Sequence, residues 1–306
     1  MQASVKKPVK FHGVGLHSGA VVNMTVLPAA ADRGIWFRRV DITGHDALIA
    51  ARWDCVVPSK LCTLLRNAAG AEVSTVEHIM AALAGCGIHN ALIEIDGPEV
   101  PILDGSAAPF VRALLNAGLE RQDVPVRAIE ILTEVEVRDG AASARLSPAD
   151  GLKIDFEIEF DDAAIGHQRK TLSMANGAFV RELSASRTFC RKSDVDAMQA
   201  NGLALGGTFD NAVVVDGDRI LSPGGLREAD EPVRHKMLDA LGDLALAGGP
   251  ILGLYTGERA GHAMTNRLLR ALFAQPQAWR SVRCDAATEA NLPGVGVKPA
   301  DLPVLA

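Results

Sequence analysis

Short β-branched runs alternate with longer amphipathic segments in the first part of the chain. The runs are bounded by Gly, Pro and Asp, as strands usually are. The apolar spacing over 74–86 predicts a helix, which Ser74 or Thr75 could cap and whose first turn suits the carboxylate of Glu77. Gly118 suits the C-cap of a second helix. We predict strands at 21–29, 34–40, 47–57 and 90–96, and helices at 74–86 and 106–118.

The second half repeats this order after a polar, proline-containing segment, 121–127, which we interpret as a linker. We predict strands at 128–138, 143–149, 152–160, 178–184, 211–216 and 219–222, a helical insertion at 193–202, and helices at 231–248 and 260–274. Strands followed by two helices, twice over, indicate an α+β protein of two layered domains, 1–122 and 128–283. We expect the Pro/Gly-rich tail, 284–306, to be loosely held.

Composition narrows the class of protein. A chain of 306 residues with 48% hydrophobic and 22% charged residues is expected to form a packed core. A net charge of −6 and 4% aromatic residues argue against a nucleic-acid partner. The five cysteines form no CxxC pair, and we find neither a secretory signal nor an apolar run that could span a bilayer. We therefore expect a cytoplasmic protein without stable membrane insertion.

The segment 231–248 carries a histidine and two carboxylates at helical spacing, His235, Asp239 and Asp243. Residues four apart lie on one helical face, so His235 and Asp239 could share a cation. The alternative is a solvated face that points at water. The apolar residues that flank these three side chains argue against a solvated face, because they indicate burial and buried charges need partners.

A catalytic zinc site needs three protein ligands and an open fourth position. His78, on the helix predicted in the other half, is the best third ligand, and Glu77 beside it suits a general base. The alternative for His78 is the polar N-terminus of an amphipathic helix. Nitrogen and oxygen ligands suit zinc, and the same set would accept ferrous iron.

Three more side chains have both a functional and an ordinary interpretation. His262 lies near the start of the last predicted helix and either faces water or acts as a general acid, with Asp243 placed to hold its positive charge. Lys236 is either an exposed lysine or a charge for an anionic substrate group. Thr188 is either a β-edge threonine or a hydroxyl donor.

The glycine-rich segments 12–19 and 202–210 look like weak phosphate-binding loops. Neither lies between a predicted strand and a predicted helix, as those motifs require. We interpret both as turns.

Taken together, several motifs closely resemble the UDP-3-O-acyl-N-acetylglucosamine deacetylases, zinc amidases that commit the pathway to lipid A. They are "GVGLHSG", "TVEHIMAALAGCGIHNALIEIDGPEVPILDGSAAPF", "SRTF", "RHKMLDALGDL" and "GHAMTNRLL". The resemblance runs from about residue 3 to about 275. It implies two sandwich domains of similar βααβ topology with the active site between them, and small insertions at about 40–70 and 190–222.

The resemblance also assigns roles. It implies zinc ligands His78, His235 and Asp239, base Glu77, acid His262 with its partner Asp243, oxyanion donor Thr188, and Lys236 for the substrate's charge. The substrate contacts that it implies are Lys236, Arg259, Phe160, Phe189 and Met198, the last on a helical face with Val195 that would receive the acyl chain. Two positions depart from the family pattern: Arg259 stands where a lysine is expected, and His89 where aspartate is usual.

We therefore expect zinc-dependent hydrolysis of the N-acetyl group of a UDP-3-O-acyl-N-acetylglucosamine by a monomer, giving a free 2-amino sugar nucleotide and acetate. Two alternatives remain. One is a zinc amidohydrolase that acts on another acylated amine, and the other is a protein in which zinc only joins two domains.

Overall fold

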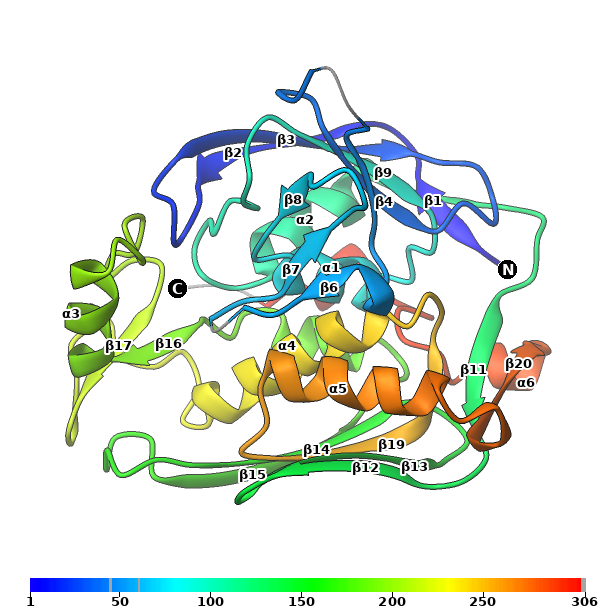
Figure 1. The fold of residues 1–306 in the computed structure, drawn as a ribbon. Coiled ribbons are helices and arrows are strands. Elements are labelled where there is room, and N and C mark those ends of the chain that lie inside the picture. Colours follow the sequence, from blue (N-terminus) through cyan, green and yellow to red (C-terminus); the bar gives the residue numbers. More distant parts are fainter. Residues whose placement is uncertain (44–45, 60, 304–306) are drawn as a thin grey trace.

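The computed structural model describes residues 1–43, 46–59 and 61–303, and these residues form stacked layers (Figure 1). A sheet from each half lies on the outside, and helices of both halves pack against each other between the sheets. This arrangement confirms the predicted α+β class. Across the described ranges, no helix has both the length and the apolar character that a bilayer crossing requires.

The first half forms the upper sheet of Figure 1, in the strand order β2-β3-β9-β4-β5. These strands are β2 (Val9–Val14), β3 (Val21–Pro28), β4 (Ile35–Arg39), β5 (Leu48–Ala50) and β9 (Ala91–Ile95). Val22, Met24 and Val26 are buried at alternate positions of β3, since successive side chains point to opposite faces of a sheet. Below the sheet lie α1 (Glu77–Gly85) and α2 (Ala108–Ala117), and Gly118 ends α2 with a φ of 81°, as predicted.

The second half forms the lower sheet, with the order β12-β13-β19-β11-β20 and β14 pairing with both β19 and β15. Its strands are β11 (Arg127–Ile131), β12 (Val135–Asp139), β13 (Ala142–Pro148), β14 (Lys153–Glu159), β15 (His167–Ser173), β19 (Ile251–Glu258) and β20 (Trp279–Arg283). The helices α4 (Glu231–Ala245) and α5 (His262–Phe273) cover this sheet.

The prediction of a strand at 178–184 is wrong. Residues Phe179–Leu183 form a single π-helical turn, η2. Phe179, Val180 and Leu183 are all buried, and a spacing of one and four residues is helical. The Ser184 hydroxyl donates to the carbonyl of Val180 at 2.6 Å, which ends the turn.

Two predicted strands are interrupted in the structure. The segment 47–57 contains β5, the 3-10 turn η1 (Trp53–Cys55) and β6 (Val56–Val57), and the segment 128–138 is divided between β11 and β12. The capping prediction for α1 is also wrong. Val76 occupies the N-cap position, because Thr75 has a φ of 57° and its hydroxyl donates to Glu99 instead.

Four strands of the two large sheets were not predicted. β2 includes residues 12–14 of the glycine-rich segment interpreted as a turn, and β15 is a mostly polar edge strand. β20 at the other edge alternates polar and apolar residues only weakly. β19 lies inside the sheet and was missed because its glycines are typical of turns. Neighbouring side chains leave no room for larger residues there: a Cβ at Gly253 would lie 2.7 Å from Ile131.

Two small sheets lie in or beside the segments where insertions were expected. The first consists of β6, β7 (Leu64–Arg66) and β8 (Glu72–Val73). The second consists of β16 (Phe189–Arg191), β17 (Val213–Asp216) and β18 (Arg219–Ile220), beside which lies α3 (Lys192–Ala200). A further pair, β1 (Ala3–Val5) with β10 (Leu119–Arg121), joins the start of the first half to its end.

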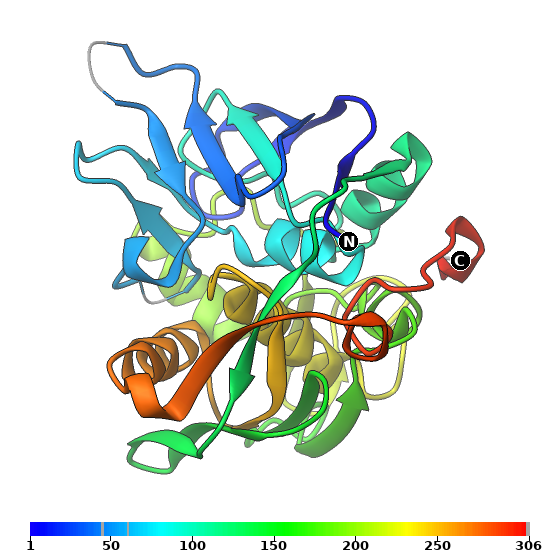
Figure 2. The same cartoon turned by 90° about the vertical axis from the view of Figure 1, so that its right-hand side faces the viewer.

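The tail makes specific contacts. It contains α6 (Ala286–Glu289) and passes along the side of the molecule seen in Figure 2. Leu292 is 1% exposed and packs in a small apolar cluster with Val126 and Leu252. The terminal ammonium of Met1 forms an ion pair with Glu289 at 2.6 Å.

The two halves meet at the crossing of α1 and α4. A Cβ at Gly242 would lie 2.1 Å from the carbonyl oxygen of Glu77, so only glycine permits this approach. The crossing places the first turn of α1 beside the middle of α4, where the predicted catalytic residues lie.

Candidate active site

Three potential ligand atoms converge at this crossing. His78 comes from α1, and His235 and Asp239 come from α4; each offers one atom, and these atoms lie within 4.8 Å of one another. The Oδ1 atom of Asp239 lies 3.3 Å from Nε2 of His235 and 3.6 Å from Nε2 of His78. All three side chains are buried.

The donor set fits a divalent metal ion. Oδ1 of Asp239 is buried and has no hydrogen-bond partner among the described residues, which is costly unless a cation or proton satisfies it. Nδ1 of His235 donates to the carbonyl of Ser186 at 3.0 Å, so the lone pair of the neutral ring is on Nε2, which faces Asp239. Burial lowers the pKa of His235 to about 4, which keeps the ring neutral.

Glu77 and Asp243 are linked through one residue of the first insertion. The backbone N–H of Thr63 donates to Oε2 of Glu77 at 3.0 Å, and its hydroxyl donates to Oδ1 of Asp243 at 2.5 Å. The other oxygen of Asp243 lies 2.8 Å from Nδ1 of His262. Nε2 of His262 is then 3.7 Å from Oε1 of Glu77 and 3.9 Å from Oδ2 of Asp239, so Glu77 and His262 lie side by side next to the ligand cluster.

The pKa values of these two groups shift in the directions that acid–base chemistry needs. Burial raises the pKa of Glu77 above its ordinary value, which makes the carboxylate a stronger base. Burial alone would lower the pKa of His262, but the carboxylates of Asp243, Glu77 and Asp239 reverse this and raise it to about 9 in the metal-free site. His262 is therefore cationic at neutral pH.

The side chain of Lys236 forms an ion pair within the site. Its ammonium donates to Oδ2 of Asp239 at 2.8 Å. Burial alone would lower the pKa of Lys236, but Asp239 raises it above its ordinary value. The contact leaves Oδ1 of Asp239 as the oxygen that faces the histidines.

His17 also reaches the cluster, and the sequence did not single it out. It lines a cavity of about 30 Å³ together with Glu77, His78, Thr188 and His262. Burial lowers the pKa of His17, although Glu99 acts in the opposite direction. The "GVGLHSG" motif was the available signal, but its glycines indicated only a turn.

Glu99 positions the loop that carries His17. Its carboxylate, 1% exposed, accepts hydrogen bonds from the backbone N–H groups of His17 and Ser18 at 2.9 and 2.8 Å. The hydroxyl of Thr75, just before α1, donates to the same carboxylate at 2.9 Å. One buried side chain thus connects the glycine-rich loop to the first turn of α1.

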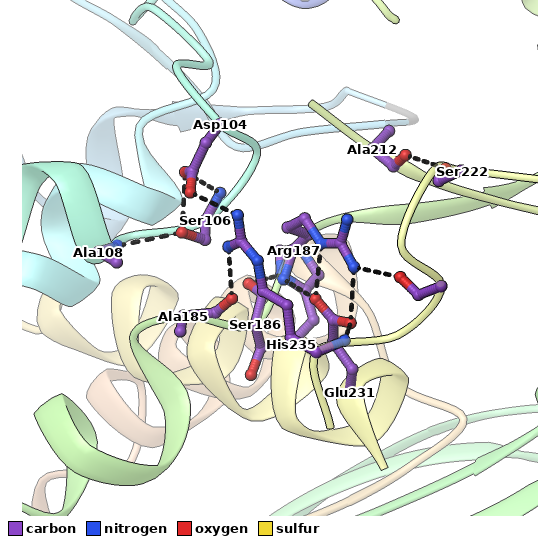
Figure 3. Close-up of polar contacts among 12 residues, drawn as sticks. Asp104, Ser106, Ala108, Ala185, Ser186, Arg187, Ala212, Ser222, Glu231 and His235 are labelled. Atoms are coloured by element: carbon purple, nitrogen blue, oxygen red, sulfur yellow. Dashed lines mark hydrogen bonds and ion pairs between the residues drawn. The ribbon is translucent and has the colours of Figure 1, made fainter. Parts of the chain in front are cut away.

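A buried ion pair between Arg187 and Glu231 lies near His235, as Figure 3 shows. Nε of Arg187 lies 2.9 Å from Oε1 of Glu231, and the same oxygen accepts a bond from the Arg187 backbone N–H. Arg187 directly follows Ser186, whose carbonyl orients His235. Neither charged residue was predicted as part of the site, although Arg187 lies in the motif "SRTF" and Glu231 begins the segment "EPVRH".

Arg227 extends this network to the first half. Its guanidinium donates to the carbonyl of Ala185 at 2.8 Å and to the carboxylate of Asp104 at 3.0 Å. Its backbone N–H donates to Glu231 at 2.6 Å. The segment 184–188 is therefore held from both halves.

The predicted substrate contacts are spread over a wider area. Thr188 lines the small cavity, and Phe189 next to it packs edge-on against His235 and Phe160, with ring centroids 6.3 and 5.5 Å apart. Met198 is half-buried on α3, outside that cavity. The guanidinium of Arg259 forms an ion pair with Glu159.

His89 lies away from the ligand cluster. Its Nδ1 accepts a hydrogen bond from the backbone N–H of Ala3 at 3.1 Å. Burial lowers its pKa to about 4. The ring is thus a neutral acceptor within the first half.

Comparison with known proteins identifies the family. A family model described as UDP-3-O-acyl N-acetylglycosamine deacetylase matches residues 2–274. The chain belongs to this deacetylase family. It is 53% identical over 279 residues to the UDP-3-O-acyl-N-acetylglucosamine deacetylase of Phenylobacterium zucineum (strain HLK1), which covers 91% of this chain and 95% of the relative.

Other relatives are similar over comparable lengths. The enzyme of the same name from Anaeromyxobacter sp. (strain Fw109-5) is 49% identical over 282 residues, 92% of this chain and 91% of its own. That from Shewanella frigidimarina (strain NCIMB 400) is 46% identical over 294 residues, 95% of each chain. The resemblance read from the motifs is confirmed. Members of the deacetylase family are metal-dependent hydrolases that act on an amide bond, and here the group formed by His78, His235 and Asp239 could hold the metal.

Proposed function

We propose that this chain removes the acetyl group from the 2-amino position of a UDP-3-O-acyl-N-acetylglucosamine, the committed step of lipid A biosynthesis. One observation carries the proposal: three ligand atoms from the two halves converge beside a buried carboxylate and a cationic histidine, which lie 3.7 Å apart. A metal ion, a base and an acid in such an arrangement can together hydrolyse an amide. The relatives named for this reaction match at least nine-tenths of the chain.

We propose Zn²⁺ at the centre, held by His78, His235 and Asp239, with Fe²⁺ as the alternative ion. When bound, the ion supplies Lewis-acid chemistry, which polarises the amide carbonyl and lowers the pKa of a water. Glu77 accepts the proton of the attacking water. Protonated His262, held by Asp243, donates a proton to the departing nitrogen.

The oxyanion that develops on the acetyl carbonyl needs positioned donors. We assign this role to the hydroxyl of Thr188 and to the protonated ring of His262. Both line the small cavity with Glu77 and His78. His17 lines it too and is placed to contact the substrate.

The remaining contacts are proposed for recognition of the substrate. Phe189 and Phe160 form an aromatic edge beside His235 for the sugar nucleotide. Lys236 and Arg259 serve its negative charge, and the substrate would have to compete with Asp239 for Lys236 and with Glu159 for Arg259. The half-buried face of α3 with Val195 and Met198 receives the acyl chain.

We further propose a cytoplasmic monomer whose two domains comprise 1–122 and 128–283. The acylated substrate would then enter the site between the two domains from the aqueous phase.

Acetate release from the purified, zinc-loaded chain tests the function. We expect turnover of the acylated UDP sugar, and a loss of at least about 100-fold in kcat for Glu77→Ala and His262→Ala, since general acid–base groups contribute about 10²–10⁴. The exposed His12 provides a matched control, and His12→Ala should retain normal rates. Equal turnover of substrates that lack the nucleotide or the 3-O-acyl chain would instead favour an amidohydrolase for another acylated amine.

A further inference from the structure

A second cavity, of about 670 Å³, lies between the two halves. None of its lining residues in the described ranges also lines the small catalytic cavity. The helices α1 and α4 separate the two: their N-terminal and middle residues face the catalytic cluster, and Met80, Leu83, Leu241 and Leu244 line the second cavity. The volume is within the range of small-molecule sites.

All three tryptophans of the chain line this cavity, namely Trp36, Trp53 and Trp279. Trp53 stacks on Phe273 with ring centroids 4.9 Å apart, and Trp279 packs edge-on against Phe273 at 5.0 Å. The first half contributes Trp53 and the second contributes Phe273 and Trp279, so the wall spans the junction of the halves. Aromatic rings with a polar edge are typical of sites that are apolar at one end and wet at the other.

The ring faces are largely engaged within the protein. Phe273 covers Trp53, and the guanidinium of Arg270 lies 5.7 Å from the centroid of the same ring. The guanidinium of Arg33 lies 4.9 Å from the centroid of Trp36. A ligand that needs to stack between free aromatic faces, such as a nucleobase, is therefore disfavoured.

The cavity combines an aliphatic floor with positive charge. Arg33 and Arg127 line it, and neither has an ion-pair partner among the described residues. Asp32, a carboxylate in the lining, accepts a hydrogen bond from Gln2 at 2.7 Å. An excess of arginine in a chain of net charge −6 points to an anionic ligand.

We propose that this cavity binds a single-chain anionic amphiphile, with a fatty-acid carboxylate at Arg33 and Arg127 and its aliphatic tail along the half-buried Ile35, Ala84 and Ala245. The site is distinct from the acyl-chain face proposed on α3. Binding here does not depend on the deacetylase activity, so the two proposals can fail separately.

Intrinsic fluorescence provides a direct test, because all three tryptophans report on this cavity. Dodecanoate, titrated below its micelle concentration into the purified full chain, should give a saturable change in emission. Dodecyl phosphate tests a phosphate headgroup, hexanoate tests the need for the tail, and dodecyltrimethylammonium tests the need for negative charge. Weaker binding of hexanoate and no saturable change with the cation are expected.

Variants locate the site. Arg33→Gln with Arg127→Gln should weaken dodecanoate binding about fivefold to tenfold, the effect expected of two partly exposed ion pairs. Arg112→Gln is the matched control, because Arg112 is an exposed arginine outside the cavity. Ala245→Phe should abolish binding by filling the cavity, and Ala84→Leu is the milder substitute if the first variant unfolds.

Three results would overturn the proposal. They are no saturable change with dodecanoate, equal affinity for dodecanoate and dodecyltrimethylammonium, or unchanged affinity in both the arginine double variant and a folded cavity-filling variant. A tighter response to dodecyl phosphate than to dodecanoate would reject the carboxylate as the preferred headgroup.

Discussion

The guanidinium of Arg187 and the carboxylate of Glu231 form an ion pair inside the protein, with Nε and Oε1 2.9 Å apart and side chains 7% and 1% exposed. Glu231 starts α4, and Arg187 lies between the carbonyl that orients His235 and the proposed oxyanion donor Thr188. The pair therefore joins the N-terminus of α4 to the loop that carries Thr188, and both border the proposed metal site.

Glu231→Gln should destabilise the protein by about 3 kcal/mol, because it leaves the buried guanidinium without its counter-charge. Urea unfolding measures this. Asp216→Asn is the control, since it breaks an ion pair with Arg219 in which both side chains are well exposed, and it should cost less than about 1 kcal/mol. Equal small effects of the two variants would show that the buried pair does not support the fold.

Gly242→Ala should lower both stability and activity. The new Cβ would overlap the carbonyl of Glu77, so α1 and α4 must separate, at a cost of about 1–3 kcal/mol. The shift also moves the base, and kcat should fall more than the stability loss explains at a temperature where the variant is folded. Gly261→Ala is the stability control, because its Cβ would meet nothing within 4 Å. A fully active Gly242→Ala would contradict this account of the crossing.

Substitution of His78, His235 or Asp239 by alanine should lower the metal content of the purified protein to well below one ion per chain. Each change removes one of three ligands. Elemental analysis measures the content, with His12→Ala as the control. One full equivalent of metal in all three variants would place the ion elsewhere.

Removal of the metal by a chelator should abolish turnover but leave the circular dichroism spectrum unchanged. The helices that hold the ligands are also held by apolar packing and by the contact of Lys236 with Asp239. Unfolding on chelation would instead favour a zinc ion that only joins the halves. Re-addition of Zn²⁺ should restore activity.

Asp243→Asn should move the alkaline limb of the kcat/KM profile to lower pH. Asp243 is the largest of the charges that raise the pKa of His262 to about 9, so its removal lets that pKa fall and the required proton is lost earlier. The pH–rate profile measures this, and Asp216→Asn should leave it unchanged. An unshifted alkaline limb would exclude His262 as the acid.

The same pKa affects the stability of the metal-free chain. His262 has a folded pKa of about 9 against an ordinary value of 6.5. A group whose pKa is raised by folding stabilises the folded state fully below the ordinary pKa, and this contribution is lost as pH rises through the folded pKa. Stability should therefore decline between about pH 6.5 and 9 in the metal-free wild type, and less steeply in His262→Gln.

Local sequence patterns were sufficient to predict many of the helices and strands. The helices α1, α4 and α5 and the strands β3, β4 and β9 follow from apolar periodicity and their flanking residues. The stripe of His235, Asp239 and Asp243 was visible because helical spacing places residues four apart on one face. The assignment of 178–184 as a strand failed because its buried residues, Phe179, Val180 and Leu183, have helical spacing.

Other features had no local signal. β19 contains two glycines, Gly253 and Gly257, that allow neighbouring side chains to approach the strand closely. These close contacts form only when the sheet is assembled, so the local sequence does not reveal them. His17 and Glu99 are 82 residues apart, and Arg187 and Glu231 are 44 apart. Contacts at such separations depend on the packing of whole elements, which periodicity does not reveal.

By itself, the sequence determined the class of fold, the helices and the chemical types of the candidate ligands, because each depends on residues within a few positions of one another. Only the tertiary structure decided that His78 faces Asp239, that Thr63 joins Glu77 to Asp243, and that the three tryptophans share one cavity. These relationships arise where α1 and α4 cross at Gly242, and the crossing is set by the packing of two distant halves.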